Sequence, residues 1–549
     1  MNLIEKRFGT LDFTPLRTAT AAVAAMAFSG AAIAQETSQT VASPLEKHAD
    51  RQFNFETANQ LQRGGVKLWI GSHQTVPGQQ STGTAEQYYW GGGEWGVSDR
   101  VQLGFAYNVF NDPVTKPVLG ASARLRMETT SFHGKYKLID NAQWGVAAQA
   151  SVEQLLFRFQ PYGGAVDDTH TIGSLHLPIT YKASDALQLH VTPGVSVLPS
   201  TINGNAFFGT VASVGAGFSW KPSLRWLTYG SVNMPVSGGN TISNTLAIEK
   251  TPIWTVGARY NVTPLAALDL FATNGGGVSP ATGILSTVPD GDTVMIGGMI
   301  TYTPGRRAGY RPNYRGTSAE PLNTRQKNLQ LDGFTLASAD TLGPGRFAFL
   351  ASAGSGDSYA GSLKFSPDYD LEIEVAYEQH SIDGSVGAPS IPSNDPNYSI
   401  GGKMRFLDQN NGSPFSLAVH LLAGRDTNAA GNGTFYLGMP MTYKANSRMA
   451  LNLNPKGAIW GNTERFGLGF GVNYAVTPEL DAIGEITPVS GGEDVVWAAG
   501  LRYHVRGSGL SVDLHASNAI GRHALKSMIG QDDVKITLGA TMAFDWLRR

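Results

Sequence analysis

The chain has 549 residues, of which 66 are Gly and none is Cys, and its net charge at pH 7 is −2. Charged residues make up only 15% of it, well below the quarter or so that is usual in soluble domains. The absence of Cys excludes thiolate metal sites and cysteine nucleophiles, and the near-neutral charge gives no sign of a nucleic-acid partner.

The first 34 residues have the pattern of a secretory signal peptide. A basic region is followed by a short apolar stretch that ends in Ala32-Ile33-Ala34. Small residues at this spacing predict cleavage between Ala34 and Gln35. We expect residues 35–63 to form a periplasmic segment. Beyond the signal, no apolar run is long enough for a membrane helix.

From about residue 65 onward, the chain consists of segments of roughly ten residues in which apolar and polar side chains alternate. Residues 101–109 and 534–546 show this pattern clearly. A period of two predicts β-strands with one apolar and one polar face. About ten residues is also the length of a tilted strand that crosses a membrane.

Short and long connections alternate between these segments. The short connections in the first half lie near residues 97–99, 140–141, 183–184, 221–223 and 262–264. The long ones lie near residues 111–128, 158–169, 199–206, 237–250 and 275–291. An up-and-down membrane barrel has this asymmetry, with tight periplasmic turns and longer outer loops.

The second half of the chain repeats the first half in the same order. The matching segments are 134–140 with 402–408, 177–183 with 439–445, 235–239 with 488–492, and 257–260 with 500–503. Several matches in one order indicate an internal duplication. We therefore predict a first barrel unit over 64–304, an Arg- and Pro-rich periplasmic linker over 305–344, and a second unit over 345–549.

The predicted fold is all-β, a transmembrane antiparallel up-and-down β-barrel made of two homologous units of about 12 strands each. The units could close as two tandem barrels or as one barrel of about 24 strands. A barrel of the larger size needs a plug for its lumen. Neither 35–63 nor 305–344 is long enough for a plug domain, which favours two barrels.

Charged side chains at strand positions are expected to face the lumen, because Arg or Lys at the bilayer midplane costs about 2–4 kcal/mol. The candidates for lumen and selectivity residues are Lys135, Lys137, Arg259, Asp269, Glu372, Glu374, Lys403, Arg405, Arg502 and Asp513. The pair formed by Arg259 and Asp269 recurs as Arg502 and Asp513. These groups could form a charged constriction that selects solutes, or interior ion pairs that fill the barrel.

No residue pattern in the chain predicts catalysis, a metal site or a cofactor. Ser511, Asp513 and His515 share one strand face, but a triad needs the His between the nucleophile and the acid. His176 and His190 could approach each other across a hairpin. The second copy has Gly438 and Asn452 at the matching positions, which argues against a shared metal site.

The chain resembles a broad family of outer-membrane transporter barrels, including those linked to the meta-pathway of phenol degradation. The resemblance rests on Thr57-Ala58-Asn59-Gln60-Leu61 with its echo Ala339-Asp340-Thr341-Leu342, on Leu177-Pro178-Ile179-Thr180-Tyr181 with its twin, and on the length of one barrel unit. It covers each copy separately, so the tandem arrangement departs from the usual single unit. The resemblance implies passive uptake of small molecules and assigns no functional residue.

These observations predict an outer-membrane channel or transporter of a Gram-negative bacterium, through whose polar lumen small solutes diffuse. Its expected partners are the outer-membrane lipid, the barrel assembly machinery and a small solute. The alternative is a structural or interaction barrel of the cell envelope with a closed lumen.

Overall fold

The computed structural model describes residues 44–78, 86–163, 168–304, 323–356, 358–379, 396–426, 433–461, 463–491 and 494–545. The predicted signal peptide, with its cleavage site at Ala34 and Gln35, lies outside these residues, as does the predicted linker up to residue 322. None of the helices in these ranges combines the length and the apolar character needed to span a bilayer.

Barrel 1 is a meander in which each strand pairs with the next one along the chain. Its strands are β3 (Val66–Thr75), β4 (Gln87–Gly96), β5 (Val101–Pro113), β6 (Arg124–Asp140), β7 (Trp144–Phe159), β8 (Asp168–His176), β9 (Ile179–Lys182), β10 (Leu187–Val197), β13 (Thr210–Trp220), β14 (Trp226–Ser237), β17 (Ile253–Asn261), β18 (Ala266–Thr273) and β19 (Met295–Tyr302). β8 and β9 are two halves of one strand, interrupted at Pro178, which has no N–H to donate to the ladder.

Barrel 2 repeats this meander. Its strands are β20 (Arg346–Gly354), β21 (Ser358–Asp368), β22 (Leu371–Gln379), β23 (Asn397–Leu407), β24 (Ser416–Asp426), β25 (Gly433–Gly438), β26 (Met441–Asn446), β27 (Met449–Trp460), β28 (Thr463–Ala475), β29 (Leu480–Thr487), β30 (Val496–His504), β31 (Leu510–Ala519) and β32 (Gly530–Asp545). β25 and β26 are again halves of one strand, interrupted at Pro440. This strand is the twin of the Pro178 strand, as the sequence repeat predicts.

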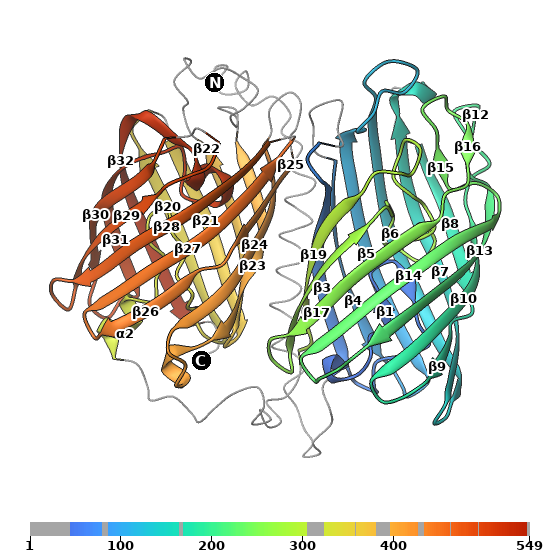
Figure 1. Ribbon diagram of the computed structural model, residues 1–549, viewed down its shortest axis with the longest axis horizontal. Helices are drawn as coiled ribbons and strands as arrows, with labels where there is room; N and C mark the ends of the chain where they lie inside the picture. Colours follow the sequence, from blue (N-terminus) through green and yellow to red (C-terminus); the bar gives the residue numbers. More distant parts are fainter. Residues whose placement is uncertain are drawn as a thin grey trace, which may run out of the picture.

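Both barrels are closed antiparallel barrels of 12 strands, and they stand next to each other (Figure 1). β19 pairs with β3 in barrel 1, and β32 pairs with β20 in barrel 2. The predicted all-β fold is therefore confirmed. Of the two predicted closures, the structure has two barrels, because each copy joins its own last strand to its own first.

The two ends of barrel 1 differ in the length of their connections, as predicted. Short turns at residues 98–100, 141–143, 183–186, 221–225 and 262–265 gather at the end that we call the inner end. The long loops at the outer end contain η2 (Gln160–Tyr162), β11 (Thr201–Ile202), β12 (Asn205–Ala206), β15 (Thr241–Ile242) and β16 (Ile248–Glu249) (Figure 1). Since each barrel has an even number of strands, its first strand begins and its last strand ends at the inner end.

The outward side chains are mostly large and apolar. Phe132, Val152, Phe466 and Ile536 are the clearest cases, with exposed fractions of 64%, 63%, 61% and 60%. Half-exposed tyrosines lie near the inner ends of the strands, at positions 181, 443, 474 and 503. An apolar band with aromatic residues at its edge is typical of barrels that span a membrane.

The barrels contact each other through part of these outer faces. Ile70, Leu268 and Ile300 of barrel 1 belong to one buried cluster with Ile373 and Leu421 of barrel 2. The cluster explains why outward side chains of β22 are buried although the alternation of their strand predicts a lipid-facing side. Polar contacts complete the interface: Tyr89 Oη donates to the backbone oxygen of Gly424 (2.7 Å), and Arg425 forms an ion pair with Asp112.

Candidate functional site

The lumen of barrel 1 holds the segment that precedes its first strand. This segment, residues 44–63, contains η1 (Pro44–Glu46), β1 (Arg51–Gln52) and β2 (Phe55–Glu56). It lies inside the barrel, so the predicted periplasmic location of these residues is wrong. Asp50 pairs with Lys67 of β3 at 2.6 Å. Lys135 of β6 donates to the backbone oxygen of Asp50 (2.9 Å) and pairs with Glu56 (3.1 Å).

The lumen of barrel 2 holds the equivalent segment. α2 (Thr324–Asn328) lies at the inner end, and residues 329–342 continue into the barrel. Asp332 pairs with Lys364 and with Lys403 (3.2 Å), and its backbone oxygen accepts a hydrogen bond from Arg502 (2.8 Å). The second part of the predicted periplasmic linker is therefore also a plug. A 12-stranded lumen is narrow enough for one extended segment to occupy it, so no plug domain is needed.

Further polar contacts hold the plug of barrel 2 to the wall. Glu485 of β29 accepts hydrogen bonds from the backbone amides of Phe334 (2.9 Å) and Thr335 (2.6 Å). Asp340 pairs with Lys444 (2.8 Å) and Arg405 (3.4 Å). The attachment is therefore mainly electrostatic, and each contact can be removed by a single substitution.

The two plugs are anchored at matching positions of the two barrels. The backbone N–H of Ala58 donates to Thr180 Oγ1 (3.1 Å), and that of Ala339 donates to Thr442 Oγ1 (2.9 Å). Thr180 and Thr442 are equivalent in the sequence repeat. The motif that begins at Thr57 and its echo are therefore the places where each plug docks on its wall.

The electrostatic surroundings keep the plug carboxylates ionised. Burial alone would raise the pKa of Asp332, but Lys364 and then Lys403 outweigh it and hold the pKa well below its usual range. The pKa of Asp50 is likewise lowered, because Lys67 and Lys135 outweigh burial. The pKa of Glu56 falls to about 2, since Lys135 and Arg51 oppose the effect of burial.

An outer loop closes each lumen from the other side. In barrel 1, Glu153 accepts a hydrogen bond from the backbone of Ala281 (2.8 Å), and an apolar cluster that includes Phe53, Trp90, Phe271 and Leu285 fills the space. Phe53, from the plug, stacks on Phe271 with 4.3 Å between ring centroids. The outer part of this lumen is therefore a packed core.

In barrel 2 the closing loop is residues 520–529, with η4 (Ala524–Met528). His523 pairs with Glu374 (3.3 Å), and Glu378 accepts hydrogen bonds from the backbone amides of Arg522 (2.8 Å) and His523 (3.2 Å). Arg522 also pairs with Asp513 (3.3 Å). Two lumen acids of β22 thus bind the loop directly.

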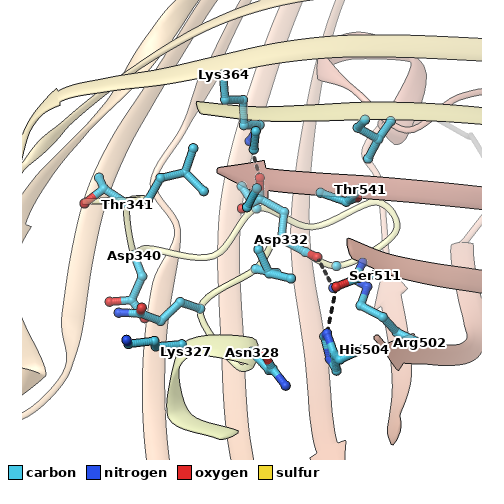
Figure 2. Close-up of a pocket in the computed structure, with 18 of the residues that line it drawn as sticks. Lys327, Asn328, Asp332, Asp340, Thr341, Lys364, Arg502, His504, Ser511 and Thr541 are labelled. Carbon is cyan, nitrogen blue, oxygen red and sulfur yellow. Dashed lines mark hydrogen bonds and ion pairs between the residues drawn. The ribbon is translucent and has the colours of Figure 1, made fainter. Parts of the chain in front are cut away.

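Barrel 2 encloses a cavity of about 950 Å³ that many charged residues line (Figure 2). At the inner end it is lined by α2 and the turn at residues 505–509, and at the outer end by Arg522 and His523. Eight basic and five acidic residues line it. The cavity therefore follows the lumen past the plug as far as the closing loop.

The structure places the predicted lumen residues in three different surroundings. Lys135, Glu372, Glu374, Lys403 and Arg405 form ion pairs or hydrogen bonds with a plug or a closing loop. Arg259 and Asp269 form a buried pair in barrel 1, with 2.9 Å between Nε and Oδ2. Lys137 lies at the inner rim, where it pairs with Asp140 (2.8 Å).

Arg502 and Asp513 of barrel 2 do not form the ion pair that the repeat of Arg259 and Asp269 predicts. Arg502 and Asp513 are register partners, as Arg259 and Asp269 are. Asp513, however, pairs with Arg522 and His515, while Arg502 binds the plug. The closing loop and the plug provide stronger partners than the neighbouring strand does.

His176 and His190 of barrel 1 do not face each other across a hairpin. His190 is the register partner of Thr180, and His176 that of Gly194. His176 Nε2 lies 3.1 Å from the backbone oxygen of Pro280, in the outer loop.

His523 predicts a pH dependence of the outer closure in barrel 2. Burial alone would lower its pKa, but Glu378 and Glu374 outweigh burial and raise it. A raised pKa stabilises the closed loop fully below about pH 6.5, the reference value of His, and this contribution is lost as the pH rises through the folded-state pKa. We expect bilayer recordings to show more frequent opening at pH 9 than at pH 6. His523→Gln should abolish the difference, whereas His176→Gln in barrel 1 should leave it unchanged.

A family described as uncharacterised conserved protein UCP029691 matches residues 392–544, within barrel 2. No curated protein matches the chain.

Among solved structures, the NanC porin is similar at 9% identity, with 43% of this chain and 98% of that chain covered and a TM-score of 0.28. The siderophore receptor PirA of Pseudomonas aeruginosa follows at 7% identity, with 88% and 81% covered and a TM-score of 0.23. The ferric-catecholate import receptor Fiu of E. coli K12 has 9% identity, 88% and 82% coverage and a TM-score of 0.22. These distant likenesses carry no argument about function.

Proposed function

We propose that the protein is a gated outer-membrane transporter in which barrel 2 provides the pathway for small polar solutes. The apolar outer faces are suited to lipid, and a closed barrel is one of the two architectures that satisfy all backbone hydrogen bonds in a bilayer. Barrel 1 acts as a scaffold, because an apolar core fills the outer part of its lumen.

The observation that carries the proposal is the cavity in barrel 2, which charged residues line. It extends from the inner end to the closing loop, and its plug and loop are held by ion pairs and hydrogen bonds. Ion pairs and hydrogen bonds can be replaced by hydrogen bonds to water at a modest cost in free energy. Opening a packed apolar core costs more, because its contacts are not replaced. Passage therefore requires the plug and the loop of barrel 2 to move while barrel 1 stays closed.

Disulfide locks test this pathway directly, because the chain has no Cys of its own. Ala339→Cys with Thr442→Cys is designed to join the plug of barrel 2 to its wall, at the point where the backbone N–H of Ala339 lies 2.9 Å from Thr442 Oγ1. In planar bilayers we expect discrete conductance steps from the wild type, loss of these steps in the oxidised double variant, and recovery on reduction.

The matched control is the equivalent lock in barrel 1, Ala58→Cys with Thr180→Cys. It should leave conductance unchanged whether oxidised or reduced. If the wild type and both reduced variants fail to conduct at any pH, the result supports the alternative, a structural or interaction barrel with a closed lumen. The plugs that occupy both lumens also favour this alternative for the resting state.

The remaining parts of the proposal follow from the outer-membrane location. A signal peptide cleaved after Ala34 would deliver the chain to the periplasm, and the barrel assembly machinery would insert it. The resemblance to barrels linked to the phenol meta-pathway implies only passive uptake of small molecules. Growth of a deletion strain on aromatic compounds as sole carbon source tests whether that resemblance extends to the solute.

A further inference from the structure

Three polar side chains on three consecutive strands of barrel 2 form a chain of hydrogen bonds near the inner end. They are Asp481 of β29, His504 of β30 and Ser511 of β31. Ser511 Oγ lies 2.7 Å from His504 Nδ1, and His504 Nε2 lies 2.8 Å from Asp481 Oδ2. The His stands between a hydroxyl and a carboxylate, which is the order of a nucleophile, a base and an orienting acid.

Ser511 and His504 line the cavity of barrel 2 (Figure 2). Asp481 is not among the residues that line the cavity, and it binds the ring nitrogen of His504 that is not bonded to Ser511. All three are buried, with exposed fractions of 5% for Ser511, 7% for His504 and 1% for Asp481. A small molecule in the cavity can therefore reach Ser511, while the protein shields the carboxylate from bulk water. Burial of this kind strengthens the interaction of the carboxylate with the His.

A donor for a developing negative charge lies on the same strand. Arg502 lines the same cavity and is two residues from His504, on the same face of β30. Its Nη1 binds the plug, but its Nε is buried and has no hydrogen-bond partner in the described part of the chain. Strand register puts Ser511 opposite His504 and Asp513 opposite Arg502, so Arg502 lies diagonally across from Ser511. A buried donor without a partner at this position is suited to bind a developing oxyanion.

Barrel 1 shows that the fold does not need this chain of hydrogen bonds. Strand register places Leu227, Asn261 and Ala267 at the positions of Asp481, His504 and Ser511. Asn261 instead donates to backbone oxygens of Leu45 (2.9 Å) and Leu224 (2.7 Å). The duplicated barrel closes at this point without any of the three side chains, so they are specific to the second copy.

We propose that Ser511, His504 and Asp481 form a hydrolytic site for small anionic carboxylic esters that enter the cavity of barrel 2. The excess of basic over acidic residues in the lining selects a negative charge on the substrate. Lys327 of α2 lies at the inner mouth of the cavity, where it would meet an arriving anion first (Figure 2).

The reaction consumes one water and yields an acid and an alcohol. Ser511 Oγ bonds to the ester carbonyl carbon while its proton moves to His504 Nδ1, and the carbonyl oxygen becomes an anion facing Arg502. The bond to the leaving oxygen then breaks, and His504 returns the proton to that oxygen. Water next attacks the acyl-serine and gives a proton to His504. The bond between Ser511 Oγ and the acyl carbon then breaks, Oγ takes this proton back from His504, and the carboxylic acid is released.

The test uses the full mature chain in detergent micelles, with a fluorophosphonate probe and the mono-4-nitrophenyl ester of succinic acid. We expect the probe to label Ser511, located by peptide mass spectrometry, and we expect turnover of the ester. Ser511→Ala and His504→Asn should each lower turnover by about 10³-fold or more. Ser517→Ala is the matched control, because Ser517 lies on the same strand face and donates to the backbone oxygen of Trp497 (2.7 Å).

Absence of labelling at Ser511, or turnover that survives in Ser511→Ala, would overturn the site. Equal kcat/KM for the succinate ester and for neutral 4-nitrophenyl acetate would overturn the anionic substrate class. Unfolding monitored by gel migration with and without heating shows whether each variant still forms its barrels. Conductance of the wild type in planar bilayers is recorded separately from ester turnover, so failure of the hydrolytic site and failure of the transport proposal are distinguishable.

Discussion

Asp332→Asn should release the plug of barrel 2 roughly 30-fold more often than in the wild type. The substitution removes the carboxylate that binds Lys364 and Lys403 but keeps the shape of the side chain. Charge-assisted hydrogen bonds contribute about 1.5–3 kcal/mol each. Glu372 and Glu374 still neutralise part of the two cations, so we expect a net loss of about 2 kcal/mol, near the lower end of that range.

A single Cys in the plug measures this release. In a chain with no other Cys, Leu336→Cys reports exposure through its rate of maleimide labelling, because Leu336 is buried in the closed state. The ratio of labelling rates with and without Asp332→Asn gives the change in opening. Asp50→Asn removes the matching carboxylate of barrel 1 and should not alter labelling in barrel 2. An unchanged labelling rate in the Asp332 variant would show that the contacts of Glu485 and Asp340 hold the plug without the ion pairs of Asp332.

Most of the barrel architecture could be predicted from the sequence, because it depends on local patterns. The alternation over residues 534–546 places Ile536 and Leu538 outside, and both are exposed in the structure. The repeat places Lys135 and Lys403 at equivalent positions, and both bind a plug. The strand pattern indicated which side chains face inward but not which partners meet them there.

The plugs could not be predicted because they have no strand pattern and bind through long-range contacts. Asp332 is 32 residues from Lys364. The similarity between the segments that begin at Thr57 and Ala339 indicates that both copies have an equivalent segment before the first strand. A repeat outside the strands does not show whether that segment lies inside or outside the barrel. The same limit applies to Ser511, whose partner His504 lies on the neighbouring strand β30. Only the register between β30 and β31 brings the two side chains together.

Arg259→Ala should destabilise barrel 1 by about 3–5 kcal/mol, because it leaves Asp269 charged and without its partner in a buried site. The exposed fractions are 5% for Arg259 and 0% for Asp269. The sequence alone predicts this Arg as a candidate selectivity residue of the lumen. The packed lumen of barrel 1 predicts instead that the reversal potential in a salt gradient stays the same while the unfolding temperature falls.

Two further variants separate these effects. Arg259→Met with Asp269→Leu replaces the buried pair by apolar side chains, and it should recover most of the stability, since such replacements are often neutral. Arg502→Ala removes the matching Arg in barrel 2, where it lines the cavity, and should shift the reversal potential toward cations. A shift in Arg259→Ala equal to that in Arg502→Ala would place barrel 1 in the conducting pathway, and the assignment of barrel 1 as a scaffold would be wrong.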